Sequence, residues 1–169
     1  MMENRLRAAT DERLSPEEAA LFDAFIGAAV TVQRNVDADL MYERNRSLSE
    51  YQTLRRLAEA PDKRLRMNEL AAAAFLSLSR MSRIVEKLEQ QGLVRREQAE
   101  GDRRGWNAIL TEAGTEWLRR SECAYASSVR RHVLDNLDNE TVSVLTAAAR
   151  RIAHLPGPRH DRIFSVNGQ

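Results

Sequence analysis

One stretch of the sequence carries closely spaced hydroxyl and guanidinium groups, which are side chains suited to contacting nucleic-acid bases and phosphates. It contains Ser79, Arg80, Ser82 and Arg83, with Lys87 one turn further on. In an α-helix these residues would lie away from an apolar stripe. That stripe consists of Leu78, Met81, Ile84, Val85 and Leu88. Arginine and short polar groups near the N-terminal turns predict a helix that reads the major groove of DNA. The alternative is an ordinary solvated helix face.

A second basic group lies in a polar segment between two short extended runs, residues 93–99 and 106–110. The segment places Arg103 and Arg104 between two glycines. This order predicts a β-hairpin whose narrow basic tip could enter a minor groove. Asp102 would repel phosphate if it faced DNA, so we expect it to hold a neighbouring arginine in place as a brace. The alternative is an ordinary charged turn.

A long amphipathic helix is predicted ahead of these motifs, over residues 16–45. Ser15 and Glu18 form a capping box, and Pro16 suits the first helical position. Apolar residues then recur three and four positions apart. They are Leu21, Phe22, Phe25, Ala28, Ala29, Val32, Val36 and Leu40. Such a helix spans about 40 Å, more than a small core can cover. We therefore expect part of the stripe to meet another chain.

Two shorter helices are predicted between the long helix and the reading helix. Ser49 and Gln52 fit a second capping box, which predicts a helix ending near Pro61. Residues 62–64 then form a polar turn, and residues 67–75 form another short helix with small apolar side chains.

The ends of the later helices are also marked in the sequence. The reading helix begins at Ser77, whose backbone N–H could bind a phosphate, and ends at Gly92, which suits a left-handed cap. Thr111 and Asp138 are expected to cap two last helices that end near residues 136 and 154.

Composition limits the class of protein. The net charge is +1, but residues 62–104 carry 10 basic and 7 acidic side chains, whereas residues 1–50 carry 6 and 10. The positive charge is therefore local to the motifs. No apolar run approaches the roughly 20 residues of a membrane span, and the first residues do not form a signal peptide. We expect a soluble, cytoplasmic protein.

Enzymatic and metal chemistry find no support in the sequence. There is no Ser-His-Asp arrangement in context, no glycine-rich phosphate loop and no recognisable pair of carboxylates. The histidines, at 132, 154 and 160, lack metal-ligand spacing. Cys123 is the single cysteine and is expected to be a buried or half-buried apolar residue. We expect no enzyme activity, cofactor or metal.

Together these motifs resemble the multiple antibiotic resistance regulator (MarR) family of bacterial dimeric winged-helix proteins. The residues that carry the resemblance are 79–89, 92–94, 102–104 and 110–114. The resemblance implies that Ser79, Arg80, Ser82 and Arg83 match base-reading and phosphate-binding positions. It also implies that Asp102 and Arg104 match the wing pair.

The implied fold is mainly α with a small β-hairpin: a winged helix-turn-helix flanked by N- and C-terminal dimerisation helices. The expected units are the N-terminal dimerisation helix at 14–45, the DNA-binding region at 46–111, the C-terminal dimerisation helices at 112–154 and an irregular tail at 155–169. The family mostly represses promoters and releases DNA when a small, often phenolic or anionic effector binds. The expected partners are therefore a second copy, a near-palindromic operator in double-stranded DNA, and such an effector.

Some alternatives remain open. A winged-helix dimer could act as a protein–protein interaction module without specific DNA binding. Phe22, Phe25 and Tyr51 could line an effector pocket, although core packing is their expected role. Redox-sensing family members carry a reactive cysteine near the start of the first helix, and this chain has none there.

Overall fold

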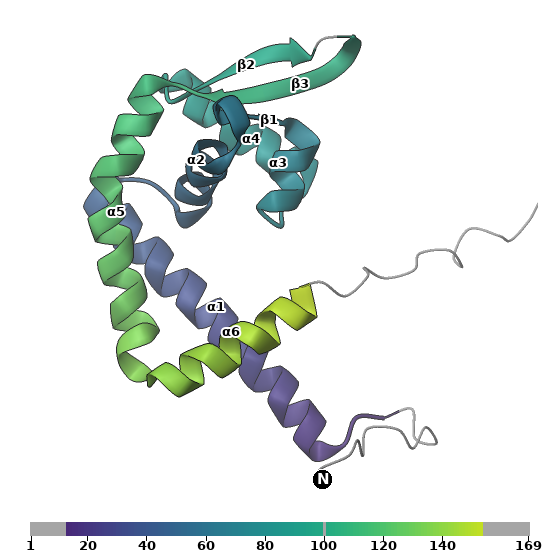
Figure 1. Cartoon of the computed structure of the whole chain (residues 1–169), viewed down its shortest axis with the longest axis vertical. Coiled ribbons are helices and arrows are strands. Elements are labelled where there is room, and N and C mark those ends of the chain that lie inside the picture. Colours follow the sequence, from purple (N-terminus) through teal and green to yellow (C-terminus); the bar gives the residue numbers. More distant parts are fainter. Residues whose placement is uncertain (1–12, 100, 154–169) are drawn as a thin grey trace, which may run out of the picture.

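The structure is a computed structural model that describes residues 13–99 and 101–153, with all side chains in these ranges except those of residues 103 and 104. The chain is mainly helical and carries one small antiparallel sheet, as predicted (Figure 1). In chain order the elements are α1 (Pro16–Arg44), α2 (Leu48–Glu59), the 3-10 turn η1 (Pro61–Lys63), β1 (Arg64–Arg66), α3 (Met67–Ala73), α4 (Leu78–Gln90), β2 (Val94–Ala99), β3 (Asp102–Leu110), α5 (Glu112–His132), the 3-10 turn η2 (Leu134–Asn136) and α6 (Asn139–Ala153).

The long first helix begins and ends where the sequence predicts. The backbone N–H of Glu18 donates to Ser15 Oγ at 3.2 Å, and the Ser15 N–H donates to Glu18 Oε2 at 2.8 Å. Asn45 ends α1 in a left-handed conformation, with φ of 53°. Only Val36 and Leu40 of α1 are buried. The expectation that Phe22 and Phe25 pack in a core is wrong within one chain, since both are exposed, whereas Tyr51 is buried as expected.

The cap of α2 differs from the prediction. Ser47 and Glu50 form the capping box, with Ser47 N–H donating to Glu50 Oε2 at 2.8 Å, instead of Ser49 and Gln52. Two overlapping motifs compete here, and a carboxylate accepts a backbone hydrogen bond more strongly than an amide does. The predicted polar turn is in fact η1 followed by β1, a strand of three residues that local sequence did not reveal.

The helix-turn-helix core lies between α2, α3 and α4. Its fully buried side chains include Leu54, Leu57, Leu70, Met81, Val85 and Leu88. The predicted end of the reading helix is confirmed: Gly92 has φ of 72°, and Leu93 N–H donates to the Leu88 carbonyl at 2.9 Å in a Schellman arrangement. Leu78 was expected in the apolar stripe but is 53% exposed, because it occupies the first turn, beyond the edge of this core.

The predicted hairpin is present and forms part of a three-stranded sheet in the order β1-β3-β2. Arg64 to Arg66 pair with Ile109 to Asn107, and Val94 pairs with Leu110. The pairing of β2 with β3 shifts between Gln98 and Ala99. The strand β3 therefore starts at Asp102, earlier than predicted.

The last helices extend away from the sheet. Thr111 caps α5 through a hydrogen bond from the Gly114 N–H at 3.0 Å, and Asp138 caps α6 through one from the Thr141 N–H at 2.7 Å, as predicted. Figure 1 shows α5 descending from the sheet, with α6 turning back at its far end. The expected tail at 155–169, which includes His160, lies outside the described residues, and so does His154.

Two further observations concern the described residues as a whole. Cys123 is exposed on α5, so the expectation that it is buried or half-buried is wrong. No helix among residues 13–99 and 101–153 is both long and apolar enough to cross a membrane.

Candidate nucleic-acid interface

The serine and arginine side chains predicted to read DNA lie on the exposed side of α4. Ser77 caps this helix, because its Oγ accepts a hydrogen bond from the Arg80 N–H at 3.3 Å. Ser79, Arg80 and Arg83 are exposed, and Ser82 is half-buried. The polar groups are therefore concentrated in the first two turns of a helix that is fixed at both ends.

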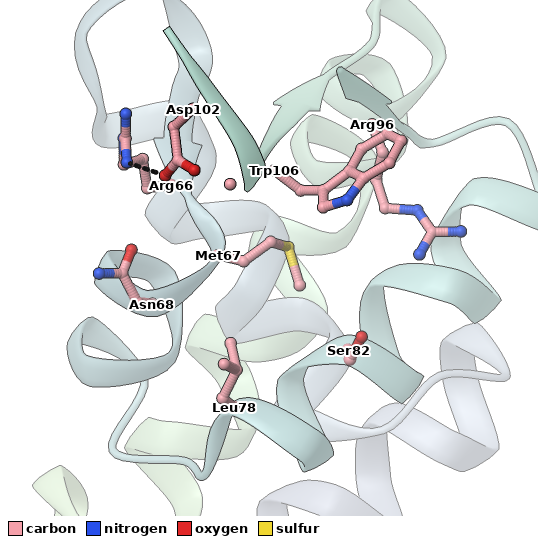
Figure 2. Close-up of a pocket in the computed structure, with 9 residues that line it drawn as sticks. Arg66, Met67, Asn68, Leu78, Ser82, Arg96, Asp102 and Trp106 are labelled. Carbon is pink, nitrogen blue, oxygen red and sulfur yellow. Dashed lines mark hydrogen bonds and ion pairs between the residues drawn. The ribbon is translucent and has the colours of Figure 1, made fainter. Parts of the chain in front are cut away.

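An open pocket of about 280 Å³ separates α4 from the wing formed by β2 and β3. It is lined by Arg66, Met67, Asn68, Leu78, Ser82, Arg96, Asp102, Gly105 and Trp106. Figure 2 shows the Arg66–Asp102 pair on one side, Trp106 and Arg96 on the other, and Leu78 with Ser82 below. Sequence reasoning missed Arg66, Asn68, Arg96 and Trp106, because tertiary packing brings them together.

The two arginines of this pocket are each fixed by a carboxylate. Arg66 Nη1 lies 3.2 Å from Asp102 Oδ2. Arg96 Nε donates to Glu89 Oε2 at 2.6 Å, and its backbone N–H donates to Glu89 Oε1 at 3.0 Å. The hydrogen bond from Arg96 holds the pKa of Glu89 below its usual range. Both guanidinium groups are thus oriented before any ligand arrives.

The predicted wing residues are placed only in part. The backbones of Arg103 and Arg104 belong to β3, but their side chains lie outside the described part of the chain. Asp102 contacts Arg66 of β1, which is distant in sequence from the hairpin tip where its partner was expected. A Cβ at Gly105 would lie 2.6 Å from Asp102 Oδ2, so any other residue at this position would require the carboxylate to shift.

Lys87, the last predicted reading-helix residue, is held by another part of the protein. Its Nζ lies 3.0 Å from Oε1 of Glu50, a buried carboxylate on α2. The side chain of Lys87 is 54% exposed. Among the described residues Lys87 therefore has a close ionic partner, whereas Arg80 and Arg83 have none there.

A second pocket, of about 370 Å³, lies between α2 and α5. Tyr51 and Tyr125 stack there with ring centroids 4.4 Å apart, and burial raises the pKa of Tyr51 to about 12. Arg55 lines the same pocket and donates to Glu59 at 2.8 Å. This pocket lies between the helix-turn-helix and α5, and its lining combines aromatic surface with one cation and two carboxylates, Glu59 and Glu122.

Comparison with known proteins gives one consistent result. A family model described as MarR family matches residues 45–105. The chain is similar to Sco3205, a MarR family transcriptional regulator from Streptomyces coelicolor solved in complex with DNA, with 36% identity, a TM-score of 0.80, and coverage of 89% of this chain and 96% of that one.

Two further solved structures show the same architecture. AbsC, another MarR family regulator from Streptomyces coelicolor, has 34% identity, a TM-score of 0.75, and coverage of 85% of this chain and 96% of that one. MarR from E. coli, with 18% identity, a TM-score of 0.65, and coverage of 85% and 100%, supports the fold alone. A search of curated protein sequences found no match.

Proposed function

Because the chain belongs to the MarR family of transcriptional regulators, we propose that it binds double-stranded DNA as a homodimer and represses transcription until a small effector releases it. The observation that carries DNA binding is the placement of exposed Ser79, Arg80 and Arg83 on the first turns of a capped helix beside a wing. Sco3205 was solved with DNA, and it is similar to this chain over most of both lengths.

The pocket between α4 and the wing supports the same proposal. A helix in the major groove and a wing in the neighbouring minor groove leave one sugar-phosphate strand running between them. Arg66, Asn68 and Arg96 line that path, and Arg66 and Arg96 are already oriented by carboxylates. Ser77, through its backbone N–H, and Ser82 would add neutral donors, and Arg103 and Arg104 would enter the minor groove.

Unpartnered apolar side chains support the homodimer. The first half of α1 exposes Leu21, Phe22, Phe25, Ile26 and Val30. The helix α6 exposes Val144, Leu145 and Ile152. Exposed apolar surface on this scale marks a protein contact, and a second copy is the partner that the family implies. A symmetric dimer would favour a near-palindromic operator.

Effector control rests on the pocket between α2 and α5. Stacked Tyr51 and Tyr125 offer aromatic walls, which suit a phenolic compound, whereas Arg55 is already paired with Glu59 in the same lining. Binding there would alter how α2 lies against α5 and so shift the reading helix. As a regulator of transcription, the protein would act in the cytoplasm.

The deciding experiment selects bound duplexes from a random pool and then titrates the selected duplex with salt. We expect an enriched near-palindromic sequence and a linear fall of log affinity with log salt, with a slope of about −0.9 per phosphate contact. Adding a hydroxybenzoate should weaken binding if the effector class is right. A protein-interaction module would enrich no sequence and show no such slope, which would reject DNA binding.

A further inference from the structure

The strongest unexplained feature near the reading helix is the buried carboxylate of Glu50. Its side chain is 2% exposed. Oε2 accepts the Ser47 N–H at 2.8 Å, and Oε1 lies 3.0 Å from Lys87 Nζ and 3.8 Å from Arg46 Nη1. Burial opposes ionisation, but the Ser47 backbone and the Lys87 ammonium outweigh it, so the pKa of Glu50 lies below its ordinary value. A charge buried this deeply requires a cation beside it.

Lys87 lies further along α4 than the other residues expected to touch DNA. Ser79 and Arg83 lie in the first two turns, whereas Lys87 lies in the third. It is rotated by about 80° from Ser79 but by only about 20° from Arg80, so it shares the face of Arg80 about 10 Å further along the helix axis, and Glu86, about 20° from Ser79, lies beside it. Glu86 is exposed, and its carboxylate would repel a phosphate there. What distinguishes Lys87 is therefore its contact with Glu50 on α2 and the carboxylate of Glu86 next to it.

The ion pair is one link in a chain of contacts that reaches α5. Arg46, beside Glu50, donates to the side chain of Gln91 at the end of α4. The same guanidinium lies 5.1 Å from the ring centroid of Trp117 on α5, a cation–π distance. The C-terminal half of α4 is thus tied by two side chains, Lys87 and Gln91, to the junction of α1 and α2 and to α5.

We infer that Lys87 is a positioning residue and not a phosphate contact: its pair with buried Glu50 fixes the orientation of α4 and so aligns Ser79, Arg80 and Arg83 with DNA. This inference rests on the proposed DNA-binding function. It revises the sequence-based assignment of Lys87, and it gives the buried Glu50 a role in recognition. Because the same network includes Trp117, it also ties the reading helix to the helix that borders the α2–α5 pocket.

The test compares salt dependence and sequence discrimination in full-length variants. The probes are a duplex selected by the wild-type protein and a scrambled duplex of the same composition. The variants are Lys87→Met, Glu50→Gln, the double variant, and Lys87→Arg, with Arg96→Met as the control for loss of a phosphate contact. Affinities are measured well below each melting temperature, so that loss of folded protein does not contribute.

If Lys87 positions the helix, Lys87→Met and Glu50→Gln should each weaken binding to the selected duplex at least about fivefold, without changing the salt slope. The scrambled duplex should bind as before, so discrimination falls. The double variant should lose no more than either single variant, and Lys87→Arg should restore binding. Arg96→Met should instead reduce the slope on both duplexes.

Several results would overturn the inference while leaving DNA binding intact. A salt slope reduced by about 0.9 per Lys87→Met substitution on both duplexes would make Lys87 a phosphate contact. Unchanged discrimination in that variant would also reject the positioning role. If Glu50→Gln fails to fold, the slope and discrimination of Lys87→Met still decide. Failure of the wild-type protein to select any duplex would instead reject the proposed function itself.

Discussion

At the scale of single residues, Arg83 is one of the side chains that we propose to read a base. It is exposed on the second turn of α4, beyond the capped first turn. We expect Arg83→Ala to cost about 1–3 kcal/mol on the selected duplex and to relax base preference at one position of each half-site. Binding to duplexes altered one base pair at a time would measure this. Arg56→Ala on α2, outside the proposed interface, is the control. Unchanged preference in the Arg83 variant would remove it from the reading surface.

Arg96 should behave differently, because in the proposed complex it contacts the sugar-phosphate backbone of DNA and not a base edge. We expect Arg96→Ala to weaken all duplexes to a similar degree and to reduce the salt slope by about 1 for each substituted contact. Arg95 is a matched control: it is the neighbouring arginine of β2, pairs with Glu97, and does not line the pocket. Equal losses in the two variants would indicate a general charge effect and would contradict a phosphate site at Arg96.

The residues of the candidate site differ in how far sequence could predict them. The exposure of Arg83 could be predicted, because the helical period of the apolar residues in α4 places it on the opposite side of the helix. Arg66 and Trp106 could not be predicted together, because β1 meets the wing only through its pairing with β3. The contact of Asp102 with Arg66 was not predicted for the same reason.

At the scale of elements, the turn between α3 and α4 contains an unusual cap. Leu76 N–H donates to the Ala71 carbonyl at 2.9 Å and Phe75 N–H to the Ala72 carbonyl at 3.1 Å, the two hydrogen bonds of a Schellman motif. The left-handed position, usually a glycine, is held by Phe75, with φ of 55°. Its side chain is 84% exposed, so little packing within the chain offsets the strain.

We expect Phe75→Gly to raise the free energy of unfolding by about 0.5–1 kcal/mol, because the Cβ clash is relieved and only part of that gain is lost to backbone entropy. Phe75→Ala removes the same ring but keeps the Cβ, and should bring no such gain. Denaturant unfolding of both variants measures the difference. A less stable glycine variant would mean that the ring of Phe75 packs against something outside the single chain.

Element boundaries were predictable where the signal is local. The capping box of Ser15 and the glycine end of α4 depend on residues within one turn, and both were found as predicted. The N-cap of α2 could not be predicted in this way, because both Ser47 and Ser49 begin a valid capping motif. The strand β1 has three residues and exists through pairing with β3, more than 40 positions away, which no local pattern records.

At the scale of the whole molecule, the apolar side chains divide into two groups. One group closes the core around Leu54, Met81 and Leu88. The other lies exposed along the first half of α1 and on α6, although the period of α1 is as regular there as over its buried end. Sequence alone predicted the stripe and its need for a second chain. On the N-terminal side of Val36, the apolar side chains of α1 are no longer buried by the rest of the chain. Sequence could not predict this point, because it depends on where α5 packs against α1.

We therefore expect Phe25→Glu to separate the proposed dimer into folded monomers, because Phe25 is 49% exposed within one chain but central to the uncovered stripe. Light scattering after size exclusion gives the mass, and circular dichroism checks that helix content is kept. Affinity for a duplex with two half-sites, about 34–36 Å apart, should fall to that for one half-site, since the second contact is no longer intramolecular. Tyr42→Glu is the control on the same helix: Tyr42 is 92% exposed but lies off the stripe, so that variant should remain dimeric. A dimeric Phe25 variant would place the contact between copies elsewhere.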